Sequence, residues 1–180
     1  MAETSKGDSV PAVIIPHIQA IPGQQTWKDY GLDDLRAVDP LLRLPAPHVY
    51  EQALSLDAAL TMLQNSLGID TAGGKIDIQT PIETVTITTG NLIHLVEKRD
   101  NARERYADFI LPALQNPFEI WGTEYTDSML RKRYIGLFSG KTDVAIIVKV
   151  ESDGSIMWNM MNADRGRMNK FREGVLLWHK

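Results

Sequence analysis

The chain has 180 residues, 43% hydrophobic and 23% charged, which is typical of one globular domain with an extension. It contains no cysteine, which excludes disulfides and thiolate chemistry, and its net charge of −4 argues against a protein that coats nucleic acid. No apolar run approaches the length of a membrane span, and the first residues lack the apolar segment of a signal peptide. We therefore expect a cytoplasmic protein without a membrane partner.

Residues 1–50 are predicted to form an irregular acidic arm or linker. They are rich in proline, glycine and aspartate, and the prolines around 10–16 restrict that segment to an extended conformation. Trp27 and Tyr30 are candidate anchors of the arm on the remainder, residues 51–180, which we expect to form an α+β domain. Charge follows a similar division, because residues 1–90 carry 5 Lys+Arg and 11 Asp+Glu, whereas the second half is weakly basic.

The first regular element expected is a helix from Ser55, a good N-cap, to about Ser66, with Gly68 closing it. A break at Thr80-Pro81 precedes a short strand over 84–89. That strand leads directly into the most informative segment of the chain, residues 91–115.

Residues 91–115 have the periodicity of one long amphipathic helix, with Pro112 kinking its last turn and Asn116-Pro117 ending it. Arg99 and Arg103 fall in the middle of the apolar face, where an unpaired guanidinium is costly. Such a placement favours an anion site, although either arginine could instead reach the rim or pair with a carboxylate. Beside that face lies a narrow stripe of His94, Lys98, Asn101 and Arg105.

The segment after Pro117 predicts an antiparallel meander, because runs rich in Val, Ile, Tyr and Trp alternate with turn formers such as Asp153-Gly154. The fold class is therefore α+β, with helices packed on one face of four or five antiparallel strands. Arg131 and Arg133 share one strand face with Ile135, and Lys132 lies on the other face. The expected strands are 119–125, 131–138, 143–150, 155–161 and, at an edge, 174–178.

No phosphate-binding, dinucleotide or nucleophile-elbow motif is present, and the four histidines are scattered without metal-ligand spacing, so no cofactor or metal is expected. What remains is a set of basic groups on the helix and on the second strand of the meander. Basic groups between a helix and a sheet can cleave RNA without metal, by attack of the ribose 2′-hydroxyl on its phosphate. Arginine suits this chemistry because its fork binds two phosphate oxygens and stays protonated.

Several segments resemble a phage nuclease-like domain grouped with the barnase, EndoU, colicin and RelE-like ribonucleases. This domain occurs at the C-terminus of Mu-like (MuF-like) phage head-morphogenesis proteins. The segments are 92–107 (LIHLVEKRDNARERYA), 117–121 (PFEIW), 131–135 (RKRYI) and 153–155 (DGS), preceded by 25–36 (QTWKDYGLDDLR). The resemblance extends from about Gln25 to the C-terminus.

The resemblance implies a metal-independent endoribonuclease of toxin type that acts on RNA, with tRNA as a candidate substrate. It also implies an immunity protein or a phage head protein as partner, and a place in the cytoplasm or in a virion that delivers it to the host cytoplasm. The implied catalytic residues are His94, Lys98, Arg99, Arg103, Arg131 and Arg133. The implied substrate-binding residues are Arg105, Asn159, Arg167 and Lys170.

Two departures from the relatives favour a RelE-like mechanism dominated by arginine and lysine. Enzymes of the EndoU type use two histidines, and only His179 could join His94 here. Barnase-like enzymes use a Glu–His pair, but Glu97 and Glu104 are predicted on the solvent side of the helix, leaving Glu119 or Glu124.

Three alternatives stay open from the sequence. The nuclease fold could serve as a non-catalytic virion structural or adaptor module, docked through the acidic arm. It could also be a toxin kept silent by a partner. The basic loop over 165–172 could be a solvated connection or an RNA clamp. As a separate expectation, the tryptophans pack in the core rather than stack on bases.

Overall fold

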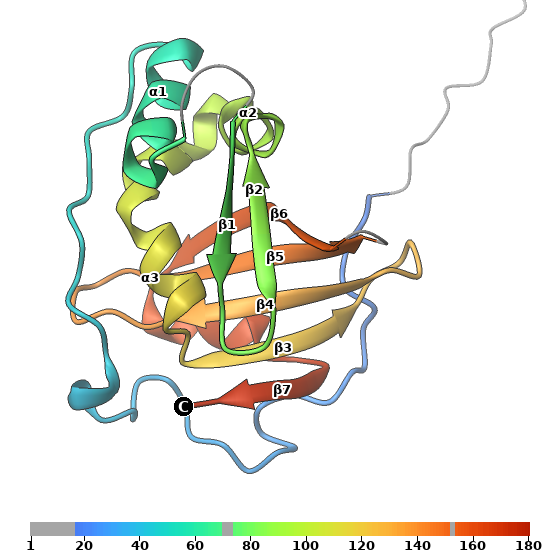
Figure 1. Cartoon of the computed structure of the whole chain (residues 1–180). Coiled ribbons are helices and arrows are strands. Elements are labelled where there is room, and N and C mark those ends of the chain that lie inside the picture. The colour runs from blue at the N-terminus through green and yellow to red at the C-terminus, as the bar shows by residue number, and fades with distance from the viewer. Residues whose placement is uncertain (1–16, 70–73, 152–153) are drawn as a thin grey trace, which may run out of the picture.

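The computed structural model describes residues 17–69, 74–151 and 154–180 (Figure 1). The extended segment predicted at 10–16 lies outside them. The helices are α1 (Leu56–Leu67), α2 (Thr89–Val96), α3 (Ile110–Gln115) and α4 (Arg165–Met168), with 3-10 turns η1 (Pro40–Leu42), η2 (Arg99–Asn101), η3 (Arg103–Phe109) and η4 (Asn169–Phe171). The strands are β1 (Lys75–Gln79), β2 (Thr84–Thr88), β3 (Glu119–Glu124), β4 (Leu130–Gly136), β5 (Asp143–Glu151), β6 (Gly154–Ala163) and β7 (Val175–His179).

The strands form one sheet in the order β1-β2-β6-β5-β4-β3-β7. The five strands from β6 to β7 are antiparallel throughout, which confirms the predicted α+β fold and its meander. The β1–β2 hairpin, of which only β2 was predicted, joins β6 through a short parallel contact at Val85↔Ser155 and Thr86↔Ile156. In Figure 1 this hairpin crosses in front of the other strands, so it covers part of the sheet.

The first face of the sheet is buried under α2, α3 and the hairpin, with α1 packed outside against α2 and η3. Local sequence explains both helix starts: the Ser55 hydroxyl accepts from the Ala58 amide, and Thr88 forms a capping box with Asn91. Gly68 ends α1 with φ +68°, a conformation that suits glycine. The predicted helix over 55–66 and the strand over 84–89 are therefore confirmed.

The single helix predicted over 91–115 is wrong. The chain leaves α2 at Val96, makes the η2 turn, and passes through Ala102, whose φ of +42° is left-handed, before η3 and α3 continue. Residues 97–101 are all polar, so that turn has no apolar side chain to pack on the core. A straight 25-residue helix would extend about 37 Å, whereas the break lets α2 pack on β6 and α3 on β4 and β5. Pro112 lies in the first turn of α3, where proline is tolerated better than in a helix interior.

The second face of the sheet is covered by the arm, α4 and η4. The arm has no regular element longer than η1 among its described residues, but it is anchored: Leu35 is fully buried, and the Tyr30 ring meets the Trp121 ring edge-on at 5.3 Å. Trp27, Leu32 and Val38 pack on the same cluster, which also contains Met168 and Phe171. Gly174 admits β7 beside β3, because a Cβ there would lie 2.1 Å from the Gly122 carbonyl oxygen.

Candidate active site

Three predicted site residues gather around the C-terminal end of α2. His94 is on its last turn, Lys98 follows in the next turn, and Arg103 folds back so that its Nη1 lies 3.4 Å from the Leu95 carbonyl oxygen. His94 is about half exposed, and its Nδ1 contacts Glu97 Oε1 at 2.7 Å. That contact fixes the ring and leaves Nε2 available to accept or donate a proton. Glu97, predicted to be badly placed, therefore supports His94 directly.

Arg103 is the least well compensated of these cations. It is partly buried, and burial lowers the pKa of its guanidinium. Its guanidinium contacts are the long bond to Leu95 and a 3.9 Å approach of Nη2 to the Met161 Sδ, and no carboxylate of the described residues pairs with it. Because Met161 packs on the second face of the sheet, Arg103 contacts β6 beyond the short stretch, Ser155 and Ile156, that pairs with β2. A positive group so placed would be stabilised by a bound anion.

Arg99 and Arg105 point elsewhere and tie the segment before α1 to the helical region. Arg99 Nη2 donates to the Ala53 carbonyl at 2.6 Å and to Glu104 Oε1 at 2.8 Å, while Arg105 Nε donates to the Tyr50 carbonyl at 2.9 Å. Glu104, predicted on the solvent side, is fully buried and also accepts from the Ala53 amide. Arg99 therefore neutralises a buried carboxylate, as the structural alternative for it proposed.

Arg131 and Arg133 do not face the helical cations. Their strand neighbour Ile135 packs in the second-face cluster, whereas Tyr134 packs under the helices. Arg131 makes a two-bond ion pair with Asp127, and its hydrogen bonds hold the pKa of that carboxyl at about 2. Arg133 binds Glu173 Oε1 at 3.0 Å and the Tyr125 hydroxyl. The prediction that these two arginines meet His94, Lys98, Arg99 and Arg103 in one cleft is wrong.

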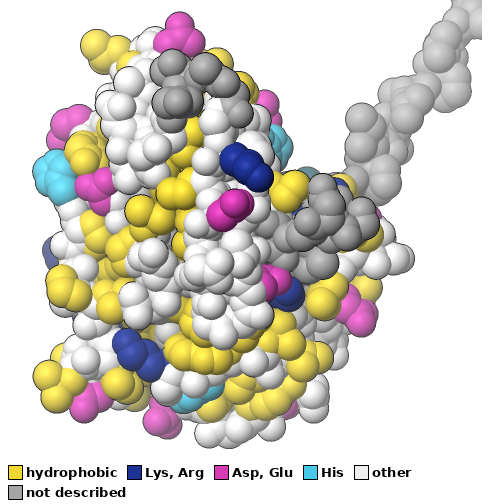
Figure 2. Space-filling view, viewed as in Figure 1, with side chains coloured by type: hydrophobic (Ala, Val, Ile, Leu, Met, Phe, Trp, Pro, Cys, Tyr) yellow, Lys and Arg dark blue, Asp and Glu magenta, His cyan; other side chains and the backbone are white. Residues whose placement is uncertain are grey.

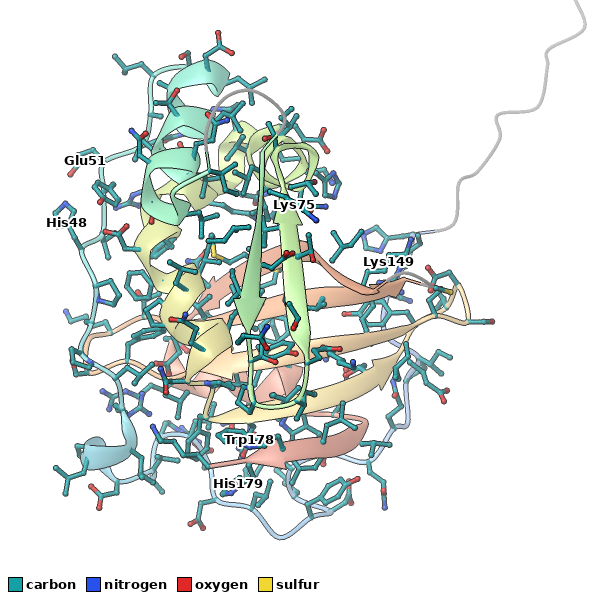
Figure 3. The ribbon with its side chains drawn as sticks, viewed as in Figure 1. His48, Glu51, Lys75, Lys149, Trp178 and His179 are labelled. Atoms are coloured by element: carbon teal, nitrogen blue, oxygen red, sulfur yellow. The ribbon has the colours of Figure 1, made fainter. Side chains whose placement is uncertain are left out.

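The structure instead assembles a buried charge cluster at the opposite edge of the sheet. Glu119 is fully buried and accepts two bonds from Arg172, at 2.6 and 2.7 Å, and one from the Trp121 indole. His179 Nε2 lies 3.8 Å from Glu119 Oε1, and Figure 3 shows His179 at the end of β7. Arg172 was seen only as part of a basic loop, because the pairing depends on contacts across 53 residues of sequence.

His94 and His179 cannot act on one phosphate. α2 packs beside β6, and β7 is four strands away in the sheet order, a separation of about 19 Å at the usual strand spacing. Lys75, which pairs with Thr88 just before α2, lies in the upper half of Figure 3, whereas His179 lies near the bottom. A two-histidine site of the EndoU type is therefore not formed by these residues.

The remaining predicted residues lie on β6, α4 and η4. Asn159 is on β6, and its Oδ1 accepts from the Met160 amide. Arg167 is exposed and pairs with Asp164, and the exposed Lys170 approaches the Phe171 ring at 5.0 Å. Trp121 is a fully buried core residue, as the packing interpretation expected.

Two kinds of feature were not found in the described ranges 17–69, 74–151 and 154–180. No three His, Cys, Asp or Glu side chains converge as metal ligands would. None of the helices has the length and hydropathy of a membrane span.

Comparison with known proteins identifies the family. The model of the phage-Barnase-EndoU-ColicinE5/D-RelE like nuclease2 family matches residues 64–179, from within α1 to β7. No curated protein and no solved structure matches the chain. The matched range includes the whole sheet and the cluster at the end of α2, and it leaves out the arm. The chain therefore belongs to the phage-Barnase-EndoU-ColicinE5/D-RelE like nuclease2 family.

Proposed function

We propose that this protein is an endoribonuclease that cleaves RNA without a metal ion, at the end of α2. The observation that carries the proposal is Arg103, a partly buried guanidinium without a carboxylate partner among the described residues. It is folded back onto the Leu95 carbonyl, which directly follows the carboxylate-supported His94 in the chain. A guanidinium in that state can stabilise the charge that develops on a phosphorane. Arg99, Arg131 and Arg133 are occupied by ion pairs, so they are not the principal phosphate ligands in the proposal.

In the proposed reaction the ribose 2′-oxygen attacks the adjacent phosphorus. The 2′-hydroxyl proton passes to His94 Nε2, the P–O5′ bond breaks, and the 5′-oxygen takes a proton from solvent or from the protonated imidazole. The products are a 2′,3′-cyclic phosphate and a 5′-hydroxyl. Arg103 and Lys98 hold the non-bridging oxygens, and Glu97 orients the His94 ring through its contact with Nδ1.

The test is cleavage of RNA by the purified full chain in EDTA, with the product ends identified by mass spectrometry. Arg103→Ala should lower the cleavage rate by about 100- to 1000-fold, and His94→Ala by about 100-fold or more. Lys180→Ala, which removes an exposed cation beside β7, is the control and should cleave like wild type. A 2′-deoxy nucleotide at the cleavage site should block the reaction, because the nucleophile is then missing.

The biological setting is part of the proposal. The resemblance to a C-terminal domain of phage head-morphogenesis proteins supports a toxin that is carried in a virion or expressed from a prophage, with tRNA as a candidate target and an immunity protein or head protein as partner. Expression of wild-type protein should stop growth of host cells, and expression of Arg103→Ala should not.

The pairing of three predicted site arginines favours a second candidate, a virion adaptor that retains the nuclease fold. Wild-type protein that leaves total tRNA and rRNA intact in EDTA and in Mg²⁺, and is harmless when expressed, would support the adaptor and contradict the nuclease.

A further inference from the structure

A groove runs between the arm and the segment that follows β6. It consists of two adjoining hollows of about 630 and 560 Å³, which share Arg36 and Gly166 as lining residues. Gly140, Lys141 and Arg165 line the first hollow, and the second is lined by arm residues together with Asn169 and Lys170. The groove is thus formed jointly by the arm, the β4–β5 connection and α4–η4.

The acidic groups that line the groove are already neutralised. Asp34 accepts two bonds from Arg36, at 2.8 and 3.0 Å, which hold the pKa of its carboxyl far below the usual range. Asp164 accepts the Arg167 amide as a cap and pairs with that arginine's Nε at 3.6 Å. Glu173 binds Arg133 at 3.0 Å.

The lysines that line the groove have no such partner in the described chain. Lys28 lies over the Trp27 ring at 5.4 Å, and Lys170 lies over the Phe171 ring at 5.0 Å. Lys141 is exposed, and no carboxylate within residues 17–69, 74–151 and 154–180 pairs with it. Arg165 adds a further positive group, held by a 3.4 Å bond to the Gly140 carbonyl. The groove is therefore positive on a chain whose net charge is −4.

The face shown in Figure 2 has a different character. Its Lys and Arg side chains are scattered singly, and Asp and Glu side chains lie between them. α4 packs on the second face, behind the sheet in Figure 1, so the groove belongs to another side of the molecule.

The groove begins close to the proposed cleavage site. Arg103 contacts Met161, and β6 continues only to Ala163 before the groove residue Arg165. Four residues of extended chain span at most about 13 Å, so a strand whose phosphate lies at Arg103 would enter the groove within a few nucleotides.

We infer that this groove binds the sugar–phosphate backbone of a single-stranded nucleic acid on one side of the cleaved bond. The inference deepens the proposed nuclease function and rests on it for the identity of the ligand. A positive channel with aromatic side chains in its wall is the arrangement that binds single strands without reading sequence, and here Trp27 is the aromatic residue that lines the groove. Lys28, Lys141 and Lys170 supply the unpaired charge, and the arm supplies one wall of the channel.

The test measures binding rather than cleavage. The full chain is titrated into fluorescent single strands of about 12 nucleotides, one of 2′-O-methyl RNA, which cannot be cleaved by the proposed mechanism, and one of DNA with the same sequence. Wild type should bind both strands, and the affinity should fall steeply as salt rises. Lys141→Ala with Lys170→Ala, one from each hollow, should weaken binding about 10-fold and make the salt slope shallower by about 1.4, since each single-strand phosphate contact contributes about 0.7.

The matched control removes the same charge outside the groove, by Lys75→Ala with Lys180→Ala, and should bind like wild type. Equal loss in the two double variants, no binding of either strand at low salt, or binding of an acidic protein surface alone would overturn the inference. If binding depends on the groove but wild-type protein cleaves no RNA, the nuclease proposal is contradicted and the binding inference stands. If the groove variant binds and cleaves like wild type, only the binding inference is contradicted.

Discussion

Two charged regions of this molecule differ in how their charges are compensated. On the second face of the sheet, Arg172–Glu119 and Arg43–Asp143 are ion pairs whose four side chains are all at least 99% buried. At the end of α2, His94 and Lys98 are exposed and Arg103 is only partly buried. A buried charge is costly without its partner. Arg43 on the arm and Arg172 before β7 must therefore stay beside their carboxylates on the sheet, which holds the arm and β7 in place. Incompletely paired charges at the surface remain available to a ligand.

The largest expected effect is the loss of stability caused by substituting Arg172. Arg172→Met should lower the free energy of unfolding by about 3–5 kcal/mol, because Glu119 would remain buried without its partner. Urea denaturation followed by circular dichroism measures this change.

Arg36→Met is the control, since Arg36 pairs with Asp34 but is 72% exposed, and it should cost less than about 1 kcal/mol. Glu119→Gln combined with Arg172→Met should cost less than the two single changes together. Similar small losses at Arg172 and Arg36 would show that the buried pair does not hold the arm.

Arg99 and Arg103, four residues apart, should separate stability from activity. Arg99→Ala should cost about 2–3 kcal/mol, because it strands the buried Glu104 carboxylate. Arg103→Ala should cost about 1 kcal/mol or less, since it breaks no ion pair and removes only stem packing and the long 3.4 Å bond to the Leu95 carbonyl. Thermal and urea unfolding of both variants, beside their cleavage rates, measures the contrast. A large destabilisation by Arg103→Ala would show that Arg103 has a structural role, contrary to the prediction.

The break in the helical region predicts that an alanine-to-glycine substitution stabilises the protein, which is the reverse of its usual effect. Ala102→Gly should raise the free energy of unfolding by about 0.5–1 kcal/mol, because glycine adopts φ +42° without the strain that a Cβ causes. In an uninterrupted helix the same change would lower stability by about 1 kcal/mol. Ala58→Gly on exposed α1 is the matched control and should be destabilising. A loss of stability in Ala102→Gly would contradict the left-handed conformation and support a continuous helix through residue 102.

The smallest expected effect concerns pH. Arg131 holds the pKa of Asp127 at about 2, below the ordinary 3.8. Because the folded-state pKa is depressed, the pair stabilises the protein above the ordinary value, and this contribution is lost as pH falls from about 3.8 to about 2. NMR titration of the Asp127 carboxyl should report the low value, and Arg131→Gln should move it back toward 3.8. An unchanged pKa in that variant would contradict the pairing.

Sequence periodicity was sufficient for elements whose signals are local. Ser55 and Gly68 mark α1, and the alternation of apolar residues with turn formers placed β3 to β7 within one or two residues of their bounds. The hairpin strand β1 was missed, because its Lys-Ile-Asp-Ile-Gln sequence has only two apolar residues. The helix over 91–115 failed because a 3.6-residue period continues through a segment whose polar residues, 97–101, cannot hold it on the core.

The candidate site shows the same limit. The sequence singled out His94, Lys98 and Arg103, which lie together, but it grouped them with Arg99, Arg131 and Arg133, whose partners come from elsewhere in the fold. Alternation along a strand tells which residues share a face, as it did for Arg131, Arg133 and Ile135. It does not tell which layer covers that face.

By itself the sequence determined the class of fold, the order of its main elements and the basic character of the helical region. Hydrophobic period, capping residues and turn formers act over a few neighbouring residues and can be read along the chain. Only the tertiary structure decided which cations form ion pairs and which remain incompletely paired. The carboxylates in these pairs are Glu104, Asp127, Glu173 and Glu119. The reason is physical: whether a charge is compensated depends on what lies within a few ångströms in space, and those partners come from distant parts of the chain.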